Sequence, residues 1–574
     1  MKAKSVKNAL KLTSLLLLSL SLLPAGCGSN QGEEPAPQTE EITAEADSQS
    51  DNEAVQEAET EAAKTQETSQ SEEAGQDLPI LTVASAYDNM SNEDYGENYK
   101  LYATMKADGF IILNDGYEEL QKALQENSRY AKDDINFFKE NYLGDTASLE
   151  EIVDESGMQL YYKNTAYVKR LDANVLSIER MISSFAGGAH PSSYYEDYTF
   201  DVSSGRELER SDVITDETAF EELLYSKLEE CPQKEEFFED WKDTVANELS
   251  GQEDYKLVWG LTDNGFLVTF NNYDIAPYAA GPVLIEIPYE ELTGIIDEKY
   301  VAAKGPLCHL VCRDGNWNEY YFDANGDGQE ELLRIESEPD PETEDEFGYA
   351  YSSILSVRYG QDEGSLKTET YQVMDSFSQA LVAESSDGKT YLYVSCPAEN
   401  DYSYLLIYDL SDPAAGPVSK GMNESGSFYS SAQTAGNFVI SDRINIMGTY
   451  SGYSRATIGA EGQLILNGDY EIYNYDYDAV FDPASQIKYT DDSYRQLTLL
   501  QDTTAEDESG NPLELKKDEK LIPVRTDNSS YMIFSCSDGS LVKIKYDEES
   551  IDSWPRTING IDEESLFEGI MYAG

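Results

Sequence analysis

The stretch FAGGAHPSSYYEDYTFDVSSGRELERSD, residues 185–212, decides the fold more than any other part of this sequence. It opens with a Gly-Gly turn beside His190, one of only two histidines in the chain. A tyrosine-rich strand over 195–202 and a turn at 203–205 follow, and Ser211-Asp212 leads towards helices. A strand between Gly-containing turns, with helices after it, predicts helices packed on an antiparallel sheet.

The same mixture of strand and helix patterns extends over residues 78–300. Asp108-Gly109 is expected to form a turn between two short strands, and Asp263-Asn264-Gly265 a hairpin. Asp216 is expected to cap a helix whose apolar residues recur at helical spacing. The remaining segments expected to be regular are strands over 99–105, 110–113, 158–168, 174–185 and 283–287, and a helix near 235–249. The prediction for this region is an α+β domain.

The charge of the chain limits its partners. A net charge of -71 and a pI near 4.1 argue against binding to nucleic acid, whose phosphates would be repelled, and against docking on anionic lipid. A cationic protein or metal ions are natural partners, although an acidic surface also serves solubility alone. The six cysteines are too sparse for a disulfide scaffold; a bridge involving Cys308 or Cys312 and buried free thiols both remain open.

Residues 1–27 have the features of a secretory signal: a lysine-rich start, a short apolar run, then Ala25, Gly26 and Cys27. This resembles the lipobox of bacterial lipoproteins, in which the cysteine is lipidated and becomes the mature N-terminus; an ordinary signal peptide is the alternative. The resemblance implies a location at the extracytoplasmic face of the cell membrane, with Cys27 as the only anchor. Residues 28–77 are acidic and poor in large apolar side chains, so a disordered linker is expected.

Four motifs within residues 80–300 carry a further resemblance: GGAHP at 187–191, FDVSSGREL at 200–208, YDIAPYAAGP at 273–282 and IPYEEL at 287–292. Their sequence and order resemble the paired extracytoplasmic domains of lysozyme-sensing anti-sigma factors (RsiV-type) and of PdaC-type peptidoglycan deacetylases. In the anti-sigma relatives this domain binds lysozyme. The chain lacks a second apolar run of membrane-spanning length and a deacetylase segment, so the resemblance implies a binding module alone. The expected partner is lysozyme, a similar cationic protein, or a cell-wall component.

The peptide DANGDGQEE at 323–331 places oxygen-bearing side chains at alternate positions of a tight loop. Such side chains point inward together and suit a hard cation that takes six or seven oxygen ligands, so Ca²⁺ is the expected cofactor. The loop resembles the calcium loops of integrin-type propeller repeats; an acidic turn without an ion is the alternative. Arg334 at the twelfth position excludes a helix-loop-helix calcium site. The expected ligands are Asp323, Asn325, Asp327, Gln329 and Glu331.

From residue 301 the sequence changes to short strands and turns. We expect an all-β domain over 301–505, built as a propeller or a sandwich, and a small SH3-like barrel over 506–574. The sequence contains no recognisable catalytic motif, so no catalytic residue is assigned.

The expectation is therefore a lipid-anchored, non-catalytic binding protein. Tyrosine offers a large contact area at a low entropy cost, so the tyrosine-rich strand is the expected contact surface. The predicted ligand-binding residues are Tyr194, Tyr195 and Tyr198. The alternative is a cell-wall glycan-modifying enzyme that uses a pair of carboxylates.

Overall fold

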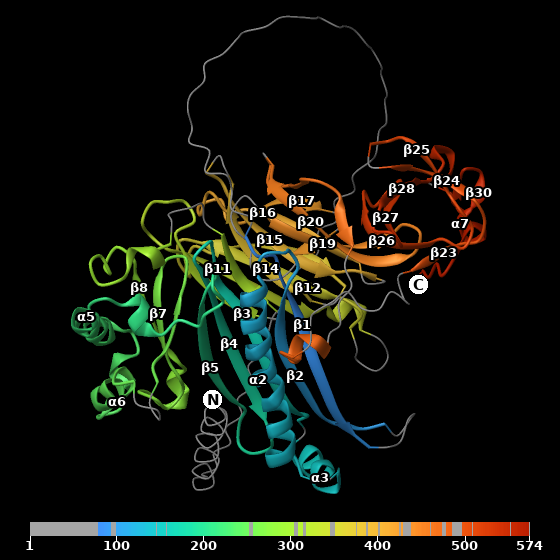
Figure 1. Ribbon diagram of the computed structural model, residues 1–574. Helices are drawn as coiled ribbons and strands as arrows, with labels where there is room; N and C mark the ends of the chain where they lie inside the picture. The colour runs from blue at the N-terminus through green and yellow to red at the C-terminus, as the bar shows by residue number, and fades with distance from the viewer. Residues whose placement is uncertain are drawn as a thin grey trace, which may run out of the picture. The chain divides into compact units, whose positions relative to one another are not determined.

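The computed structural model describes most of the chain from residue 78 onward (Figure 1). Cys27, the signal segment and the acidic linker lie outside the described residues. Among the residues described, no helix is both long enough and apolar enough to cross a membrane. The described ranges are 78–92, 99–144, 146–156, 158–251, 256–302, 308–313, 317–344, 350–374, 376–385, 388–399, 402–423, 426–428, 438–459, 461–472, 478–484, 496–507, 509–551 and 553–572.

The first module is a five-stranded sheet in the order β1-β2-β3-β4-β5. Its parallel pair, β2 and β3, is connected by the helices α2 and α3, whereas the other neighbours are antiparallel. Helix α2 lies along one face of the sheet (Figure 1). Its apolar residues, including Leu124 and Ile135, pack into the cores beneath it. The bounds are β1 Leu81–Ser91, β2 Leu101–Ile112, α2 Glu118–Tyr142, α3 Thr146–Ser156, β3 Leu160–Leu171, β4 Val175–Phe185 and β5 Ser192–Asp201.

The expected turn at Asp108-Gly109 is wrong, because β2 runs through both residues as one strand. Asp108 is fully buried, and its carboxylate accepts hydrogen bonds from Ser85 Oγ at 2.7 Å and from the Ala166 amide at 3.2 Å. Gly109 leaves space for Val480, since a Cβ at this position would lie 2.8 Å from Val480 Cγ1. Tertiary packing thus overrides the local turn preference.

A second, smaller sheet follows in the order β6-β7-β8, with helices packed around it. Its β6–β7 hairpin turns at Asp263-Asn264-Gly265 as expected, and Asp216 caps α5 by accepting from the Ala219 amide at 3.1 Å. The bounds are α4 Arg210–Val213, α5 Glu217–Glu230, α6 Trp241–Leu249, β6 Val258–Leu261, β7 Gly265–Phe270 and β8 Val283–Pro288.

The all-β part begins with two antiparallel sheets that pack face to face. The first has the order β10-β11-β12-β13 and the second β17-β16-β15-β14-β9. Leu333 and Val357 of the first sheet share a core with Val382 and Val394 of the second. The bounds are β9 Cys308–Arg313, β10 Trp317–Phe322, β11 Glu331–Pro339, β12 Ser353–Gly360, β13 Lys367–Val373, β14 Gln379–Glu384, β15 Thr390–Pro397, β16 Ser403–Asp409 and β17 Val418–Asn423.

A third sheet covers the other face of the second one. Leu381 and Tyr393 of the second sheet pack against Phe428 and Phe438 of the third. The middle sheet is therefore covered on both faces, which explains why β15 is buried along nearly its whole length. Face-to-face packing of this kind is common to both expected arrangements, sandwich and propeller.

The third sheet continues into the C-terminal unit, where β22 pairs with β26. The strands expected between 513 and 546 are present as β25 to β28, but the described strands form no closed barrel. The strands along the main path of this sheet are β19 Phe438–Asn445, β20 Thr449–Ile458, β22 Tyr470–Ile472, β24 Thr503–Asp507, β25 Pro512–Leu515, β26 Lys520–Thr526, β27 Tyr531–Cys536 and β28 Leu541–Lys545. The remaining elements of the C-terminal half are β18 Ser427–Phe428, β21 Leu464–Leu466, β23 Leu497–Leu499, β29 Thr557–Ile558, β30 Ile561–Asp562, α7 Glu563–Leu566 and β31 Phe567–Glu568. An α+β region followed by an all-β region is confirmed.

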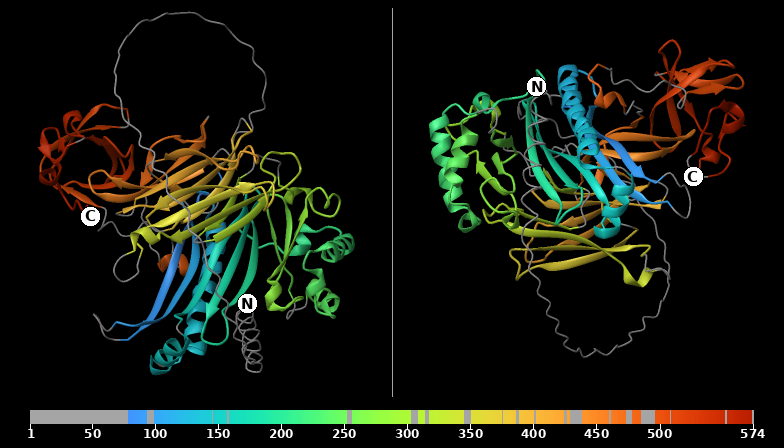
Figure 2. Two further views of the ribbon diagram at one scale, coloured as in Figure 1. Left: turned by 180° about the vertical axis from the view of Figure 1, so that it is seen from behind. Right: turned by 90° about the horizontal axis from the view of Figure 1, so that it is seen from below.

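One short turn of the all-β part packs on the first module. This turn, η6 (Asp478–Phe481), lies beside α2 and β2, where it is drawn in orange (Figures 1 and 2). Val480 is fully buried there and Phe481 nearly so, against Ala84 and Ile111. The three cysteines whose side chains are described, Cys231, Cys396 and Cys536, are buried free thiols.

Candidate functional site

Two of the motifs singled out in the sequence meet on the surface beside β5. The GGAHP turn takes its shape from Gly187 and Gly188, whose φ angles of 91° and 118° favour glycine. His190 stacks on Tyr278 of the YDIAPYAAGP segment, with 4.3 Å between the ring centroids. The Tyr278 hydroxyl also donates to the Pro191 carbonyl at 3.1 Å. Two segments far apart in the sequence therefore form one surface.

Tyr273 extends this surface. Its ring centroid lies 6.0 Å from that of Tyr278, its φ angle is 72°, and 42% of the residue is exposed. A left-handed backbone is unusual for a bulky aromatic residue, and such positions cluster at functional sites. We call His190, Tyr273 and Tyr278 the aromatic cluster.

The aromatic cluster is held in place by Asn271. Its Oδ1 accepts from the Tyr195 amide at 2.6 Å, and its Nδ2 donates to the Tyr195 carbonyl at 3.1 Å. The Asn271 side chain thus pairs with both backbone groups of Tyr195 at the outer edge of β5, as the backbone of a neighbouring strand would. These bonds attach the loop that carries Tyr273 to the first sheet. This attachment fixes the loop while Tyr273 stays exposed and Tyr278 half-buried.

The three tyrosines predicted to bind ligand lie in β5 but do not share one face. Tyr194 and Tyr198 are half-buried against the cores of the first module, and the Tyr198 hydroxyl donates to Glu196 at 2.8 Å. Tyr195 points to the opposite face, because side chains alternate along a strand. Burial raises the pKa of all three phenols.

Tyr273 and Tyr278 were not predicted as binding residues from the sequence. They lie in the YDIAPYAAGP segment, which is one of the motifs that carry the family resemblance.

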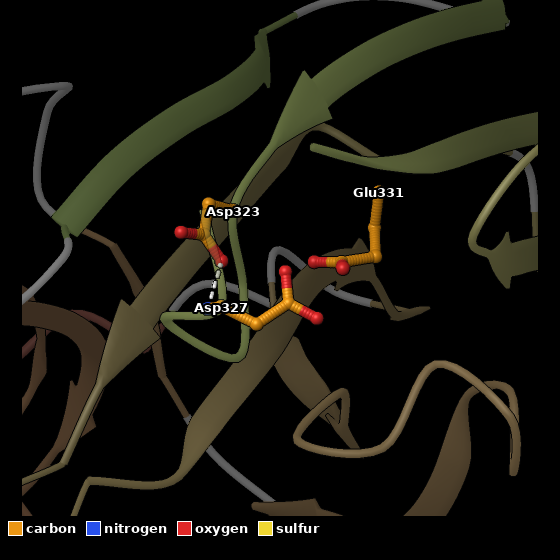
Figure 3. Close-up of side chains that lie close together, drawn as sticks. All are labelled: Asp323, Asp327 and Glu331. Carbon is orange, nitrogen blue, oxygen red and sulfur yellow. Dashed lines mark hydrogen bonds between the residues drawn. The ribbon is translucent and has the colours of Figure 1, made fainter. Parts of the chain in front are cut away.

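The predicted cation loop lies between β10 and β11. Carboxylate oxygens of Asp323, Asp327 and Glu331 lie within 4.8 Å of one another and point towards a common centre (Figure 3). Glycines at 326 and 328 allow the loop to turn, with φ angles of 76° and 84°. Three converging carboxylates are the oxygen donors that Ca²⁺ prefers, so the residues present fit that ion.

Hydrogen bonds hold the loop in this shape. Asp323 Oδ1 accepts from the Gly326 amide at 2.7 Å, and Asp327 Oδ1 accepts from the Gln329 amide at 2.9 Å. Asn325 accepts from the Asp327 amide at 2.8 Å and donates to Glu331 Oε1 at 3.1 Å. The Asn325 side chain therefore stabilises the loop by hydrogen bonds at both of its ends. Gln329 takes part through its backbone amide, which donates to Asp327.

Glu331 and Ala324 connect the loop to the core. Glu331 is fully buried and accepts from the Ala324 amide at 2.8 Å, while the Ala324 carbonyl accepts from Thr390 Oγ1 at 2.6 Å. Burial raises the pKa of Glu331, and the charges of Asp323 and Asp327 raise it further. A bound cation would offset this repulsion.

These features define a class of protein: an α+β module with an exposed aromatic surface, followed by stacked antiparallel sheets with an acidic loop. Within it, residues 211–290 match a family described as "Protein of unknown function (DUF3298)". The chain thus contains a DUF3298 domain, which includes the second sheet and both Tyr273 and Tyr278 of the aromatic cluster.

Two solved structures of that family are similar to part of the chain. A Bacteroides fragilis member is 20% identical, with 39% of this chain and 96% of that chain covered and a TM-score of 0.29. A Pseudomonas aeruginosa member is 18% identical, with 40% and 99% covered and a TM-score of 0.26. No curated protein is similar enough to count as a match.

Proposed function

We propose that this protein is a lipid-anchored, extracytoplasmic binding protein. Its anchor is Cys27, and its binding module comprises the first sheet and the DUF3298 domain. The partner is a cationic, wall-associated protein of the lysozyme type. The aromatic cluster is the single observation that carries this proposal.

The chemistry of the aromatic cluster supports binding to a protein surface. Aromatic side chains are enriched in the centres of interfaces, where they contribute large contact areas with little loss of side-chain entropy. His190 and Tyr278 are already held by hydrogen bonds to the Pro191 carbonyl, at 2.7 and 3.1 Å, so little further ordering is needed on binding. The acidic charge of the chain would accelerate the encounter with a cationic partner.

We further propose that Ca²⁺ occupies the acidic loop and stabilises the all-β part. Asp323, Asp327 and Glu331 would hold the ion, and Asn325 would orient Glu331. The role of the ion is structural, because the loop is connected through Ala324 and Thr390 to the packed sheets.

The test is binding of the purified protein to lysozyme at low and at physiological salt. Specific binding is expected to persist at physiological salt, where attraction between exposed charges is largely screened. His190→Ala with Tyr278→Ala is expected to weaken the affinity at least about tenfold, as for residues at the centre of an interface. Tyr351→Ala, at a residue that is 71% exposed and far from the cluster in sequence, is the control and should leave the affinity unchanged.

Two results would contradict the proposal. If binding disappears at physiological salt, the contact is only attraction between opposite charges. If the double variant binds as tightly as the unaltered protein, the aromatic cluster is not the contact surface.

A further inference from the structure

Two carboxylates lie side by side on neighbouring strands of the first sheet, on the face that contacts the DUF3298 sheet. Glu179 of β4 and Asp197 of β5 are direct cross-strand partners. The Cβ atoms of such partners lie about 4.5–5.5 Å apart on the same face, where two like charges repel. The pairs on either side carry opposite charges or no charge: Arg180 lies opposite Glu196, and Ile178 lies opposite Tyr198.

A bulge in β3 adds a lysine to this pair. The register between β3 and β4 shifts between Val168 and Arg170, so Lys169 is the extra residue. Bulges of this kind redirect a side chain. Lys169 Nζ lies 3.3 Å from Glu179 Oε2 and forms an ion pair with it. One positive charge thus faces two carboxylates, so it can balance the charge of only one of them.

The positive charge of Lys169 acts on Asp197, but within the described part of the chain no group donates a hydrogen bond to the Asp197 carboxyl group. Both of its oxygen atoms are buried. Gly260 of β6 covers the group, because a Cβ there would lie 3.6 Å from Asp197 Cγ. A buried, ionised carboxylate without a hydrogen-bond donor is strongly disfavoured.

The sheet that covers the pair supplies no compensating positive charge. Val258, Gly260, Leu267 and Thr269 are the residues of β6 and β7 on the covering face, and all are uncharged. Thr269 is itself fully buried, with its Oγ1 unpartnered among the described residues. The other titratable groups around Asp197 are Glu286 of β8, which acts on Lys169, and Tyr195 and Glu196 of β5.

We propose that Asp197 holds a proton while the two sheets are packed together, and that loss of this proton loosens the contact. With one proton, the group formed by Lys169, Glu179 and Asp197 is electrically neutral. Without it, an unpaired negative charge remains between the sheets. The contact lies beside the loop of Asn271, and it exists whether or not lysozyme is the partner.

The expected pH dependence follows from the direction of the shift. Burial raises the pKa of Asp197 well above its usual value, and the charge of Glu179 raises it further. The folded protein therefore retains a proton that the unfolded chain releases near pH 4. The stability that this retained proton contributes is fully present below about pH 4, where both states are protonated. It is lost as the pH rises through the raised pKa of Asp197 in the folded state.

The test is hydrogen exchange of β5 and β6 in the full chain between pH 5 and 9, corrected for the intrinsic dependence of exchange on pH. In the unaltered protein, the opening equilibrium of these strands should increase with pH, by up to about tenfold for each pH unit. Asp197→Asn keeps the shape of the neutral carboxyl group but cannot release a proton, so its opening should not change with pH. Glu140→Gln, at an exposed carboxylate of α2 on the other face of the first sheet, is the control and should retain the pH dependence.

A second variant keeps the proposal testable if Asp197→Asn does not fold. Glu179→Gln removes the opposing charge, so Lys169 can pair with Asp197 and the pH dependence should be weaker. The proposal is overturned if Asp197→Asn opens with the same pH dependence as the unaltered protein. It is equally overturned if neither protein shows any dependence.

Discussion

The Arg170 guanidinium donates to the Tyr289 hydroxyl at 2.6 Å and joins the first module to the DUF3298 domain. The same nitrogen donates to the Tyr300 carbonyl at 2.6 Å, and Asp172 accepts from the rest of the group. The arginine side chain is fully buried, so these bonds are formed away from water. The aromatic cluster lies across the same junction, with His190 from the first module and Tyr278 from the DUF3298 domain.

Replacing Arg170 with methionine should destabilise the protein by about 3–5 kcal/mol, because Asp172 and the Tyr300 carbonyl would lose a buried, charged donor. Urea unfolding followed by circular dichroism measures this change. Arg129→Met is the control, since Arg129 forms exposed ion pairs with Glu126 and Asp133 and should cost less than about 1 kcal/mol. Equal losses in the two variants would contradict the role assigned to Arg170.

Val480 should stabilise the first module although it belongs to the all-β part of the sequence. Val480→Asp would place a charge in a fully buried apolar site, at a cost of about 3 kcal/mol or more. Hydrogen exchange in α2 and β2 should increase first, because these elements contact η6. Ile465→Asp, at a residue that is 53% exposed, should change the stability by less than about 0.5 kcal/mol. Unchanged exchange in α2 and β2 would show that the first module does not need η6.

Calcium should raise the unfolding free energy of the protein by about 2.7 kcal/mol when the free ion exceeds its dissociation constant a hundredfold. Asp327→Asn and Glu331→Gln should each remove most of this increase, because each removes one of three converging carboxylates. Glu330→Gln alters the exposed neighbouring carboxylate and should leave it intact. Thermal unfolding with calcium and with a chelator measures the effect. An increase that persists in both loop variants would place the ion elsewhere.

Features that depend on neighbouring residues could be predicted from the sequence. The hairpin at Asp263-Asn264-Gly265 and the cap at Asp216 need only a few consecutive residues, and both are confirmed. The spacing of Asp323, Asp327 and Glu331 likewise sufficed to bring their carboxylates together, because alternate residues of one tight loop converge.

The aromatic cluster could be predicted only in part. The sequence identified both of its segments as distinctive, but not that His190 stacks on Tyr278. The contact surface expected at Tyr194, Tyr195 and Tyr198 remains a prediction, and the structure shows only that these side chains do not share one face. Their alternation along β5 directs two of them into the core, and which face is buried depends on the position of α2.

By itself, then, the sequence determined the α+β region, the all-β region after it and the acidic loop, because periodicity, turn residues and spacing act over short distances. Only the tertiary structure decided that Asp108 and Gly109 lie within a strand, since both residues pair with β1. It alone placed Glu179 opposite Asp197 and His190 against Tyr278. Strand register and contacts between distant segments result from packing over the whole chain, and no local pattern specifies them.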